Sequence, residues 1–498
     1  MTWNIVLGPP GTGKTTYLLN KVEEYLAKGV RPEKLGYLAF TKKAANEALN
    51  RAVDKFNYDT EQLPYFRTIH SLCYFWAGLS RGDVLDRTNL RKFSQQIGER
   101  ISSAWDGENL MSLGSKGDRM LFLENMSRNK GITYRKMWEQ SDSDFSWLHF
   151  KWFTDHYKKF KEQNFLVDYT DMLDMYLLID GSPMLDVLII DEAQDLSSLQ
   201  WSCVEKLARH SKEVYVAGDD DQAIYTWAGA DVDKFISLEG SKTILNQSYR
   251  VPRKVHDIAL GVVNRVQTRI PKVWKPKKEE GTVQFHNKVD HIDMKEGEWL
   301  ILARNNYLLN NVEEYLRLSG KVYQKNNKPS VPDNLINAIK DWEELRRGNK
   351  IEAYRIKKLL TYFKADSGIK RGYKTLKNED DDSLLDINML KLKFGLLTDK
   401  IWHESFELLG DKQREYMISC LRAGEKLVSS RIKLNTIHGS KGGEAQNIVL
   451  LTDMASKSYD ELCKNPDHEC RAFYVGVTRT KENLHIVKGK TRKEFMFI

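Results

Sequence analysis

The chain has 498 residues, of which 41% are hydrophobic, and its 77 Lys and Arg against 69 Asp and Glu give a formal net charge of +8. A chain of this length exceeds one ordinary hydrophobic core, so we expect several domains. The positive charge is compatible with a polyanionic partner, although a mildly basic protein without one has the same balance. The five cysteines show no paired spacings, which argues against a disulfide-stabilised secreted fold and for a reducing compartment.

The sequence also argues against membrane insertion and secretion. It contains no run of about 18 apolar residues, and its amino terminus enters a strand-like segment without a signal-peptide pattern. We therefore expect a cytoplasmic protein that does not associate with membranes.

Short apolar runs that end in polar residues recur along the first half of the chain. They are NIVLG (4–8), GYLAF (36–40), DVLIID (186–191) and EVYVAGD (213–219). Helix-period segments separate them, a pattern that predicts a parallel α/β sheet buried on both faces. The first helix is predicted over 15–29, ends at Gly29, and has an apolar face made of Leu18, Leu19, Val22, Tyr25 and Leu26.

The strand pattern is interrupted and then occurs a second time. Residues 76–160 have no strand signal and carry charged and aromatic residues in helical sequence, which predicts an inserted helical subdomain. Another helix-rich, highly charged stretch covers 326–430. The second set of predicted strands is GTVQFHN (281–287), EWLILAR (298–304), KLNTIH (433–438), NIVLLTD (447–453) and LHIV (484–487). The expected fold class is α/β, with two parallel-sheet domains that each carry a mainly helical insertion.

The segment GPPGTGKT at 8–15 follows the first predicted strand and opens the first predicted helix. Glycines let the backbone wrap around phosphates with its N–H groups inward, while Lys14 reaches the terminal phosphates and Thr15 can bind Mg²⁺. An ordinary glycine-rich turn is the alternative, but it does not require this order of strand, loop and helix. The predicted nucleotide-binding residues are Gly8, Pro9, Pro10, Gly11, Thr12, Gly13, Lys14, Thr15 and Thr16.

A phosphate-binding loop of this kind needs a carboxylate for its metal, and VLIIDEAQD (187–195) supplies one. Asp191 ends a buried strand and would hold magnesium through water, while Glu192 can polarise the water that attacks the phosphate. A surface turn is the alternative interpretation of this pair. Two adjacent acids with different roles indicate that the bound nucleotide is hydrolysed.

These residues resemble the UvrD/Rep/PcrA family of superfamily-one DNA helicases, beginning with DEAQD and VAGDDDQAIYTWAGAD (216–231). The resemblance continues in order through both sheet regions and does not cover 76–160 or 326–430 in detail. Its other segments are LAFTKKAANEAL (38–49), RTIHSLC (67–73), DYTDML (168–173), LNQSYRVP (245–252), ILARNN (301–306), LNTIHGSKGGEAQNIVLL (434–451) and AFYVGVTRTKENLHIV (472–487).

The resemblance implies an ATP- and Mg²⁺-dependent DNA helicase that translocates on single-stranded DNA from 3′ to 5′. It would unwind duplexes at junctions between single and double strands, act as a monomer, and have single-strand-binding, replication or repair proteins as candidate partners. Its implied parts are two RecA-like P-loop domains, 1–75 with 161–245 and 246–325 with 431–498, a helical insertion at 76–160 and a compact accessory insertion at 326–430.

The resemblance also implies roles for single residues. The catalytic set is Lys14, Asp191, Glu192, Gln222, Arg250 and Arg479. Gln222 would contact the γ-phosphate, and Arg250 and Arg479, both expected on the second sheet domain, would act as arginine fingers. Hydrolysis would then require the two domains to close around ATP. Further implied nucleotide contacts are Arg304 near the phosphates, Tyr249 on adenine and Glu444 on ribose.

A single strand is bound by aromatic faces that stack on bases and by donors to phosphates. The resemblance implies stacking by Phe40 and Trp227. The implied backbone contacts are Thr41, Thr68, His70, His438 and, more weakly, Lys441. Contacts of this kind do not distinguish DNA from RNA.

The sequence departs from the family in three places. Only three residues precede the first predicted strand, so the family's upstream glutamine motif has no counterpart and we expect relaxed adenine selectivity. Ala228 stands where relatives commonly carry arginine, and the compact 326–430 region weakens the expectation of duplex engagement. Two other functions stay open: a translocase that displaces proteins with little unwinding, and a nucleotide-switched binding protein, which the complete catalytic set disfavours.

Overall fold

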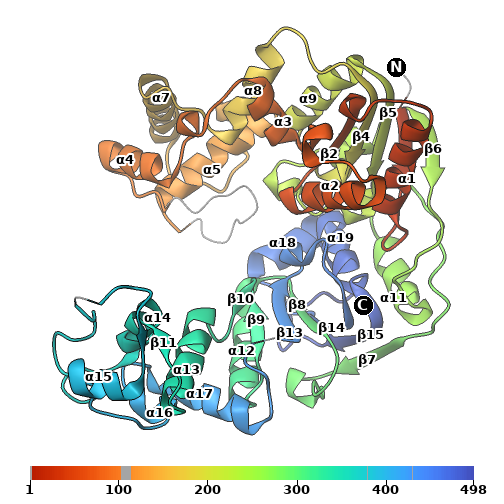
Figure 1. The fold of residues 1–498 in the computed structure, drawn as a ribbon. Helices are drawn as coiled ribbons and strands as arrows, with labels where there is room; N and C mark the ends of the chain where they lie inside the picture. The colour runs from red at the N-terminus through yellow and green to blue at the C-terminus, as the bar shows by residue number, and fades with distance from the viewer. Residues whose placement is uncertain (1–2, 103–113, 378, 429) are drawn as a thin grey trace. The chain divides into compact units, whose positions relative to one another are not determined.

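The computed structural model describes residues 3–102, 114–377, 379–428 and 430–498. The expectations for the residues before the first strand and for 103–113 of the helical insertion lie outside this described part. The chain forms two compact units, each built around its own sheet (Figure 1). The units are Met1–Glu280 with Glu461–Thr478, and Gly281–Asp460 with Arg479–Ile498.

The first unit contains a six-stranded, fully parallel sheet in the order β3-β2-β4-β5-β1-β6. Its strands are β1 (Trp3–Leu7), β2 (Leu35–Ala39), β3 (Tyr65–Thr68), β4 (Leu185–Asp191), β5 (Ser211–Gly218) and β6 (Gly240–Ile244). The four strands predicted for this sheet are confirmed. The other two escape the sequence pattern because β3 has only four residues and β6 is exposed along its whole length.

The register aligns the carboxyl ends of these strands at one edge of the sheet. Leu7 pairs with Gly218 and Ile244. Ala39 pairs with Thr68 and Asp191. Loops that follow different strands are therefore neighbours, although they are far apart in the sequence.

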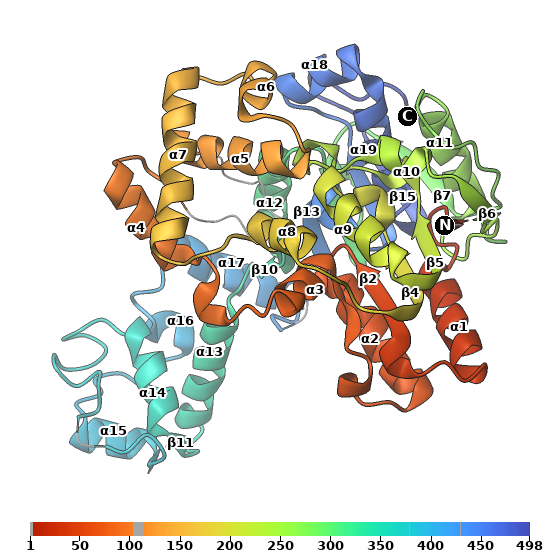
Figure 2. The same cartoon turned by 90° about the horizontal axis from the view of Figure 1, so that it is seen from above.

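Both faces of the first sheet are covered, as predicted. Ile5 and Leu7 pack with α3, α8 and α9, whereas Val6 between them packs with α1 and α2, since neighbouring side chains point to opposite faces. The two groups of helices lie on opposite sides of the strands in Figure 2. They are α1 (Lys14–Ala27) and α2 (Lys42–Phe56) on one face, and α3 (Ile69–Trp76), α8 (Tyr169–Leu178) and α9 (Ser198–Arg209) on the other. The predicted apolar face of α1 is confirmed, with Leu18, Leu19 and Val22 buried and Tyr25 and Leu26 partly buried beside them.

A helical insertion lies between β3 and β4. It has its own apolar core around Phe93, Phe150 and Phe153. Its helices are α4 (Arg87–Ile97), α5 (Lys116–Asn129), α6 (Tyr134–Glu139) and α7 (Trp147–Gln163).

Buried ion pairs join the insertion to α8. Arg128 of α5 lies 3.1 Å from Asp168 and 2.6 Å from Asp171. Lys161 of α7 pairs with the same two carboxylates at 2.5 and 2.6 Å. Asp168 also caps the amino end of α8. These charges fix the insertion against the sheet domain.

Two segments that the sequence-based boundaries assign to the second domain belong to the first unit, namely 246–280 and 461–478. They carry α11 (Arg253–Val263) and α19 (Pro466–Val477), which pack against each other. Buried polar bonds explain the difference, because the Ser248 hydroxyl binds the Pro10 carbonyl and Lys272 is enclosed by aspartates that follow β5. The first unit also contains α10 (Val232–Ile236).

The second unit contains a seven-stranded sheet in the order β10-β9-β13-β8-β14-β15-β7, parallel except for the β9-β10 hairpin. All five strands predicted for it are confirmed, and the short hairpin was outside the prediction. Its strands are β7 (Thr282–His286), β8 (Trp299–Ala303), β9 (Tyr323–Lys325), β10 (Lys328–Pro329), β13 (Ile432–Thr436), β14 (Ala445–Leu451) and β15 (Thr480–Val487).

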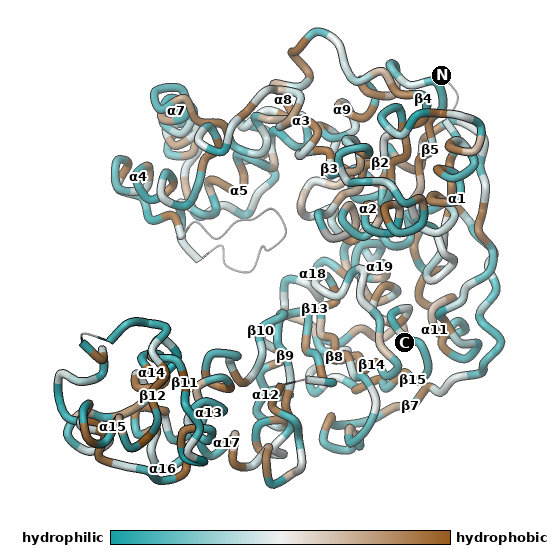
Figure 3. The backbone as a smooth tube through the Cα atoms, viewed as in Figure 1, coloured by the Kyte–Doolittle hydropathy of each residue, from teal (hydrophilic) through white to brown (hydrophobic). Residues whose placement is uncertain are grey.

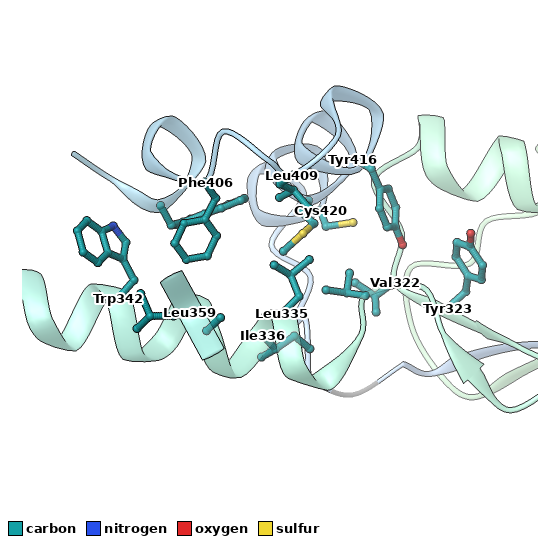
Figure 4. Packing of buried hydrophobic residues seen from close by; sticks show 14 of the residues in the cluster. Val322, Tyr323, Leu335, Ile336, Trp342, Leu359, Phe406, Leu409, Tyr416 and Cys420 are labelled. Carbon is teal, nitrogen blue, oxygen red and sulfur yellow. The ribbon is translucent and has the colours of Figure 1, made fainter. Parts of the chain in front are cut away.

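The accessory region between β10 and β13 shares one continuous apolar core with this sheet (Figure 4). Val322 and Tyr323 of the sheet side pack through Leu335 of α13 toward Trp342 and Phe406.

The strands β11 (Ile351–Glu352) and β12 (Leu384–Leu385) form a separate pair. The helices of the second unit are α12 (Leu309–Leu318), α13 (Asp333–Arg346), α14 (Ala353–Leu359), α15 (Ile387–Lys393), α16 (Trp402–Ser405) and α17 (Asp411–Arg422), while α18 (Ser456–Lys464) contains the crossing at residue 460.

Hydrophobic residues occur along the chain in short stretches that alternate with hydrophilic ones (Figure 3). Among the described residues, no helix has both the length and the apolar composition that a membrane span requires.

Candidate functional site

The predicted site residues of the first unit gather at the carboxyl edge of its sheet. The glycine loop follows β1, Asp191 ends β4, and Gln222 lies in the loop after β5. Phe40 follows β2 and Thr68 ends β3. Because the sheet order is β3-β2-β4-β5-β1-β6, the predicted nucleotide contacts occupy one side of this edge and most of the predicted nucleic-acid contacts the other.

The glycine loop has a conformation suited to phosphate binding. Gly11 has φ +71°, and a Cβ atom built on it would lie 2.4 Å from the Cβ of Arg250, so glycine is required there. Lys14 begins α1, and its ammonium donates to the carbonyl of Gly8 at 3.0 Å. The amino end of α1 carries no acidic residue in its first turn, which leaves its positive end for an anion.

Two adjacent carboxylates face this loop. Asp191 is 4% exposed and accepts a hydrogen bond from the Tyr37 hydroxyl at 2.7 Å. Burial, and then the charge of Glu192, raises the pKa of Asp191 to about 6. Glu192 lies 3.6 Å from the ammonium of Lys14 and has φ 55°, a left-handed conformation that is uncommon outside glycine. Such strain persists where the surroundings over-determine it, as at an active site.

The residues present fit a magnesium ion with phosphate. The Thr15 hydroxyl and the Asp191 carboxylate lie 3.4 Å apart, and both supply the hard oxygen ligands that Mg²⁺ prefers. Buried Asp191 and partly exposed Glu192 carry two negative charges close to the single positive charge of Lys14. A further cation at this place would therefore balance the charge.

A hydrogen-bond relay connects Glu192 to Gln222. The Gln194 amide donates to the Glu192 carboxylate at 2.6 Å and accepts from the backbone N–H of Asp219 at 3.0 Å. The Asp219 carboxylate in turn accepts from the Gln222 amide at 2.7 Å. Glu192, the predicted water-activating residue, and Gln222, the predicted γ-phosphate contact, are therefore both connected to Asp219.

Tyr249 and Arg250 follow β6 and lie against the glycine loop. The Tyr249 backbone N–H donates to the Gly11 carbonyl at 2.9 Å, and Tyr249 as a whole is 75% exposed. Arg250 belongs to the same compact unit as Lys14, and its predicted place on the second domain is therefore corrected. An exposed ring and an arginine beside a phosphate loop can bind a base and a phosphate.

An aromatic row extends from the carboxyl edge of β2. The rings of Phe40 and Tyr225 are stacked with centroids 5.6 Å apart, and Tyr225 meets Trp227 edge-on at 6.1 Å. Tyr225 therefore joins the two predicted stacking residues. Its partly exposed position beside Trp227 makes it a third candidate, which the sequence analysis did not single out.

The predicted backbone contacts of the first unit already have structural roles. The hydroxyls of Thr41 and Thr68 cap α2 and α3 by accepting N–H bonds, which leaves each hydroxyl proton for another partner. Burial lowers the pKa of His70 to about 4, so it is neutral at pH 7 and can donate an N–H bond without carrying charge. Tyr169, which is half exposed, meets the His70 ring edge-on at 6.0 Å.

The predicted residues of the second unit occupy two edges of its sheet. Glu444 and Arg479 precede β14 and β15, and the Arg479 guanidinium donates to the carbonyl of Gly443 at 3.4 Å. Arg304 and His438 follow β8 and β13 at the opposite, carboxyl edge. The parallel strands thus bring Glu444 and Arg479 together and keep Arg304 apart from them. Lys441 lies in the loop that joins β13 to β14.

Sequence reasoning missed residues whose partners are remote. Gln194 and Tyr225 were inside segments quoted for the family resemblance, and aromatic spacing with Trp227 is a signal for Tyr225. Ser248 also lies inside a quoted segment, LNQSYRVP, whereas Lys272 lies in none. The roles of both depend on remote partners, Pro10 for Ser248 and aspartates elsewhere in the chain for Lys272.

Known proteins resemble the chain over most of its length. Residues 2–243 match the family profile of the UvrD/REP helicase N-terminal domain, and residues 284–491 match that of the UvrD-like helicase C-terminal domain. A relative from Staphylococcus epidermidis, ATP-dependent DNA helicase PcrA, is 26% identical over 345 residues, which cover 64% of this chain and 45% of the relative.

Two other relatives show a similar extent of likeness. The ATP-dependent DNA helicase PcrA of Leuconostoc citreum is 22% identical over 63% of this chain and 46% of its own length. A probable DNA helicase II homolog of Mycoplasma genitalium is 24% identical over 57% of this chain and 43% of its own length. The chain thus spans about half the length of the curated relatives it matches. Because the two family profiles together cover both sheet domains, the chain belongs to the family of UvrD-like helicases.

Proposed function

We propose that this protein is an ATP-dependent DNA helicase that translocates on single-stranded DNA from 3′ to 5′ and opens duplexes at single-strand junctions. One observation carries the proposal: the hydrogen-bonded path from Glu192 to Gln222 lies in the same unit as the aromatic row of Phe40, Tyr225 and Trp227. Family membership supports the reaction class, and the 3′ to 5′ direction rests on family resemblance.

The chemistry follows from the charges at the glycine loop. Lys14 and Arg250 would bind the γ-phosphate, where negative charge increases as the terminal bond breaks. Glu192 would accept the proton of the attacking water, and its partner Gln194 orients the carboxylate. Magnesium, held by Thr15, Asp191 and the phosphates, would neutralise phosphate charge when bound.

Coupling to the strand would pass through the loop after β5. Gln222 is three residues before Tyr225 and five before Trp227 in this loop. If Gln222 shifts when it gains or loses its γ-phosphate contact, a short movement of this loop would therefore also shift Tyr225 and Trp227. Base stacking is sequence-tolerant, because every base has a π-face, and this suits a motor that moves along any strand.

The second unit would complete the reaction. Glu444 and Arg479, neighbours at one sheet edge, would bind ribose and the γ-phosphate. Arg304 lies at the carboxyl edge of the second sheet, as does His438, which is one of the implied DNA contacts. We therefore assign Arg304 to the residues that would contact single-stranded DNA rather than to those that would contact the nucleotide. Closure of the two domains on ATP and opening after hydrolysis would then drive the steps.

The test compares ATP hydrolysis with and without single-stranded DNA, and with single-stranded RNA as a separate arm. We expect DNA to stimulate turnover in the wild type and Glu192→Gln to lower kcat about 10²-fold or more while nucleotide still binds. Lys14→Ala should lose hydrolysis as well. Glu213→Gln is the matched control, since this exposed carboxylate is on β5 near the amino edge of the same sheet.

The outcomes separate the alternatives. Turnover that ignores DNA but responds to RNA would contradict a DNA helicase, and retained stimulation in Glu192→Gln would contradict the assigned chemistry. Duplexes with a 3′ or a 5′ single-stranded tail test the direction, because the proposal predicts unwinding only from the 3′ tail.

A second candidate is a translocase that displaces bound proteins with little unwinding. It is favoured by the compact accessory region, whose helices share the apolar core of the second sheet. Protein displacement and strand separation measured on the same tailed DNA discriminate the two, because the helicase performs both and the translocase only the first.

A further inference from the structure

Three adjacent aspartates, Asp219 to Asp221, directly precede Gln222 and are at most 1% exposed. The side chain of Lys272 is fully buried among them. Its ammonium lies 3.2 Å from Asp219, 2.5 Å from Asp220 and 3.0 Å from Asp221. Arg269 adds a two-pronged pair with Asp221, in which both distances are 2.7 Å. Buried charges of this density are rare unless they are paired.

The charges in this cluster are kept by their mutual attraction. Burial lowers the pKa of Lys272, but the three carboxylates outweigh it and the net pKa lies above its ordinary value. The net pKa of Arg269 is likewise raised, since Asp221 outweighs the effect of burial. Burial raises the pKa of Asp220. Two cations and the backbone N–H of Ile270, which donates to Asp220 at 2.8 Å, face three carboxylates.

Asp219 uses both of its oxygens. One accepts from the Gln222 amide at 2.7 Å, and the other lies 3.2 Å from Lys272. The backbone N–H of Asp219 donates to Gln194, which binds Glu192. The orientation of Gln222 and that of Glu192 therefore both depend on where Asp219 lies, and Lys272 holds Asp219.

Lys272 belongs to the segment 264–280, which we call the strap. The strap is fastened to α19 as well as to the aspartates. The carboxylate of Asp467 accepts the backbone N–H bonds of Gln267 and Thr268 at 2.8 and 2.9 Å. Arg471 donates to the carbonyl of Asp220 at 2.9 Å and also to that of Thr268. The strap ends where the chain enters the second unit at residue 280, and α19 ends just before the crossing at 478.

We propose that Lys272 is a positioning residue for ATP hydrolysis. Through Asp219 it orients Gln222 toward the γ-phosphate and, through Gln194, orients Glu192 toward water. Because the strap carries Lys272 and is hydrogen-bonded to α19, the rate of hydrolysis depends on the bonds that hold these two segments, which both adjoin the second unit in the chain. This inference rests on the proposed function and adds to it a group that contacts neither nucleotide nor DNA.

The test uses the full chain and compares Lys272→Met with the conservative Lys272→Arg. Three kinds of measurement are made: kcat and KM for ATP with single-stranded DNA, the affinities for ADP and for a non-hydrolysable ATP analogue, and the unfolding temperature. We expect Lys272→Met to lower kcat about tenfold or more with little change in KM, and Lys272→Arg to recover most of it. The preference for the ATP analogue over ADP should also fall, because only the former has a γ-phosphate for Gln222.

A matched control separates positioning from stability. Lys161 is also a buried lysine between two aspartates, Asp168 and Asp171, and lies outside the ATPase relay. Lys161→Met should lower the unfolding temperature and leave kcat within about twofold, since it leaves buried carboxylate charge without its cation and the change is remote from the nucleotide site. If Lys272→Met loses stability and keeps the wild-type kcat and analogue preference, Lys272 is only structural and the inference is overturned.

Asp219→Asn tests the same inference without endangering the fold. It leaves two carboxylates facing two cations, so the buried charge is better balanced, but an amide has one acceptor oxygen where Asp219 uses two. We expect kcat to fall about tenfold or more while the unfolding temperature is kept. An unchanged kcat would contradict the inference alone. A wild-type protein that DNA does not stimulate would instead contradict the proposed function.

Discussion

The Ser248 hydroxyl donates a hydrogen bond to the carbonyl oxygen of Pro10 over 2.7 Å, and this bond fastens the segment that carries Arg250 to the phosphate loop. Ser248 is fully buried, and its oxygen also accepts the backbone N–H bonds of Arg250 and Val251 at 3.3 and 3.2 Å. One side chain thus sets the distance between the loop and the arginine that follows β6.

Replacing Ser248 with Ala should weaken this fastening. The Pro10 carbonyl and two N–H groups would lose a buried partner, which costs about 1–3 kcal/mol of unfolding free energy. Because Arg250 would be held less firmly, kcat for ATP should fall several-fold. Urea unfolding and steady-state hydrolysis measure the two effects. Ser211→Ala is the control, since it removes a hydroxyl bond to Leu207 of 2.9 Å at the opposite edge of the sheet. Equal kcat in both variants would contradict the role of Ser248.

Gly11→Ala should disable the phosphate loop. The new methyl group would lie 2.4 Å from the Cβ of Arg250 at a backbone φ of +71°. Gly29→Ala is a matched control, because its φ is +85° and its Cβ would meet no atom within 4 Å. We expect Gly29→Ala to cost about 1–2 kcal/mol in unfolding free energy from backbone strain alone. Gly11→Ala should in addition weaken ATP binding, measured by titration with a fluorescent analogue. Wild-type affinity in Gly11→Ala would contradict the geometry.

Much of the fold was predictable from the sequence because parallel strands buried on both faces are continuous apolar runs. β4 (LDVLIID) and β14 (AQNIVLL) are such runs, and both were predicted. β6 (GSKTI) could not be, since it is an exposed edge strand whose backbone pairing with β1 determines it. The first helix was predictable because its apolar spacing and Gly29 are local signals.

The site was predictable only where a local pattern marks the chemistry. Lys14, Asp191 and Glu192 stand at the ends of predicted strands or in the glycine loop. Lys272 lies in an irregular segment, and nothing near it in sequence indicates three buried aspartates as partners. The grouping of 246–280 with the first unit could not be predicted for the same reason. It depends on hydrogen bonds between residues far apart in the sequence, and not on a pattern of strands.

Tyr225→Ala should weaken the response to single-stranded DNA. Tyr225 stands between Phe40 and Trp227, so its loss removes one stacking face and the support of two others. A stacked base is worth about 1–3 kcal/mol, so the DNA concentration for half-maximal stimulation should rise about 5- to 150-fold. Tyr225→Phe should keep most of the response, since the ring is retained. Tyr354→Ala, an exposed tyrosine of α14, is the control. An unchanged DNA response in Tyr225→Ala would show that Tyr225 does not contact single-stranded DNA.

The pair His286 and His485 predicts how the stability of the second unit depends on pH. Their ring nitrogens lie 3.0 Å apart across β7 and β15, and the His485 ring lies against Trp299 with centroids 5.3 Å apart. Burial, and then repulsion by His286, lowers the pKa of His485 to about 4. Burial also lowers the pKa of His286. Both rings are therefore neutral at pH 7, and one can donate to the other.

Since the folded-state pKa of His485 is below its unfolded value of about 6.5, the unfolded chain takes up the proton first. The stabilisation is fully present above pH 6.5 and is lost as the pH falls from about 6.5 to about 4. Between pH 7 and pH 5 the wild type should therefore lose about 1–2 kcal/mol more unfolding free energy than His485→Phe, which keeps an aromatic ring on Trp299. Carboxylates that titrate in this range act on both proteins and cancel in the difference. Urea unfolding followed by tryptophan fluorescence at several pH values measures it, and parallel curves for the two proteins would show that His485 is not responsible.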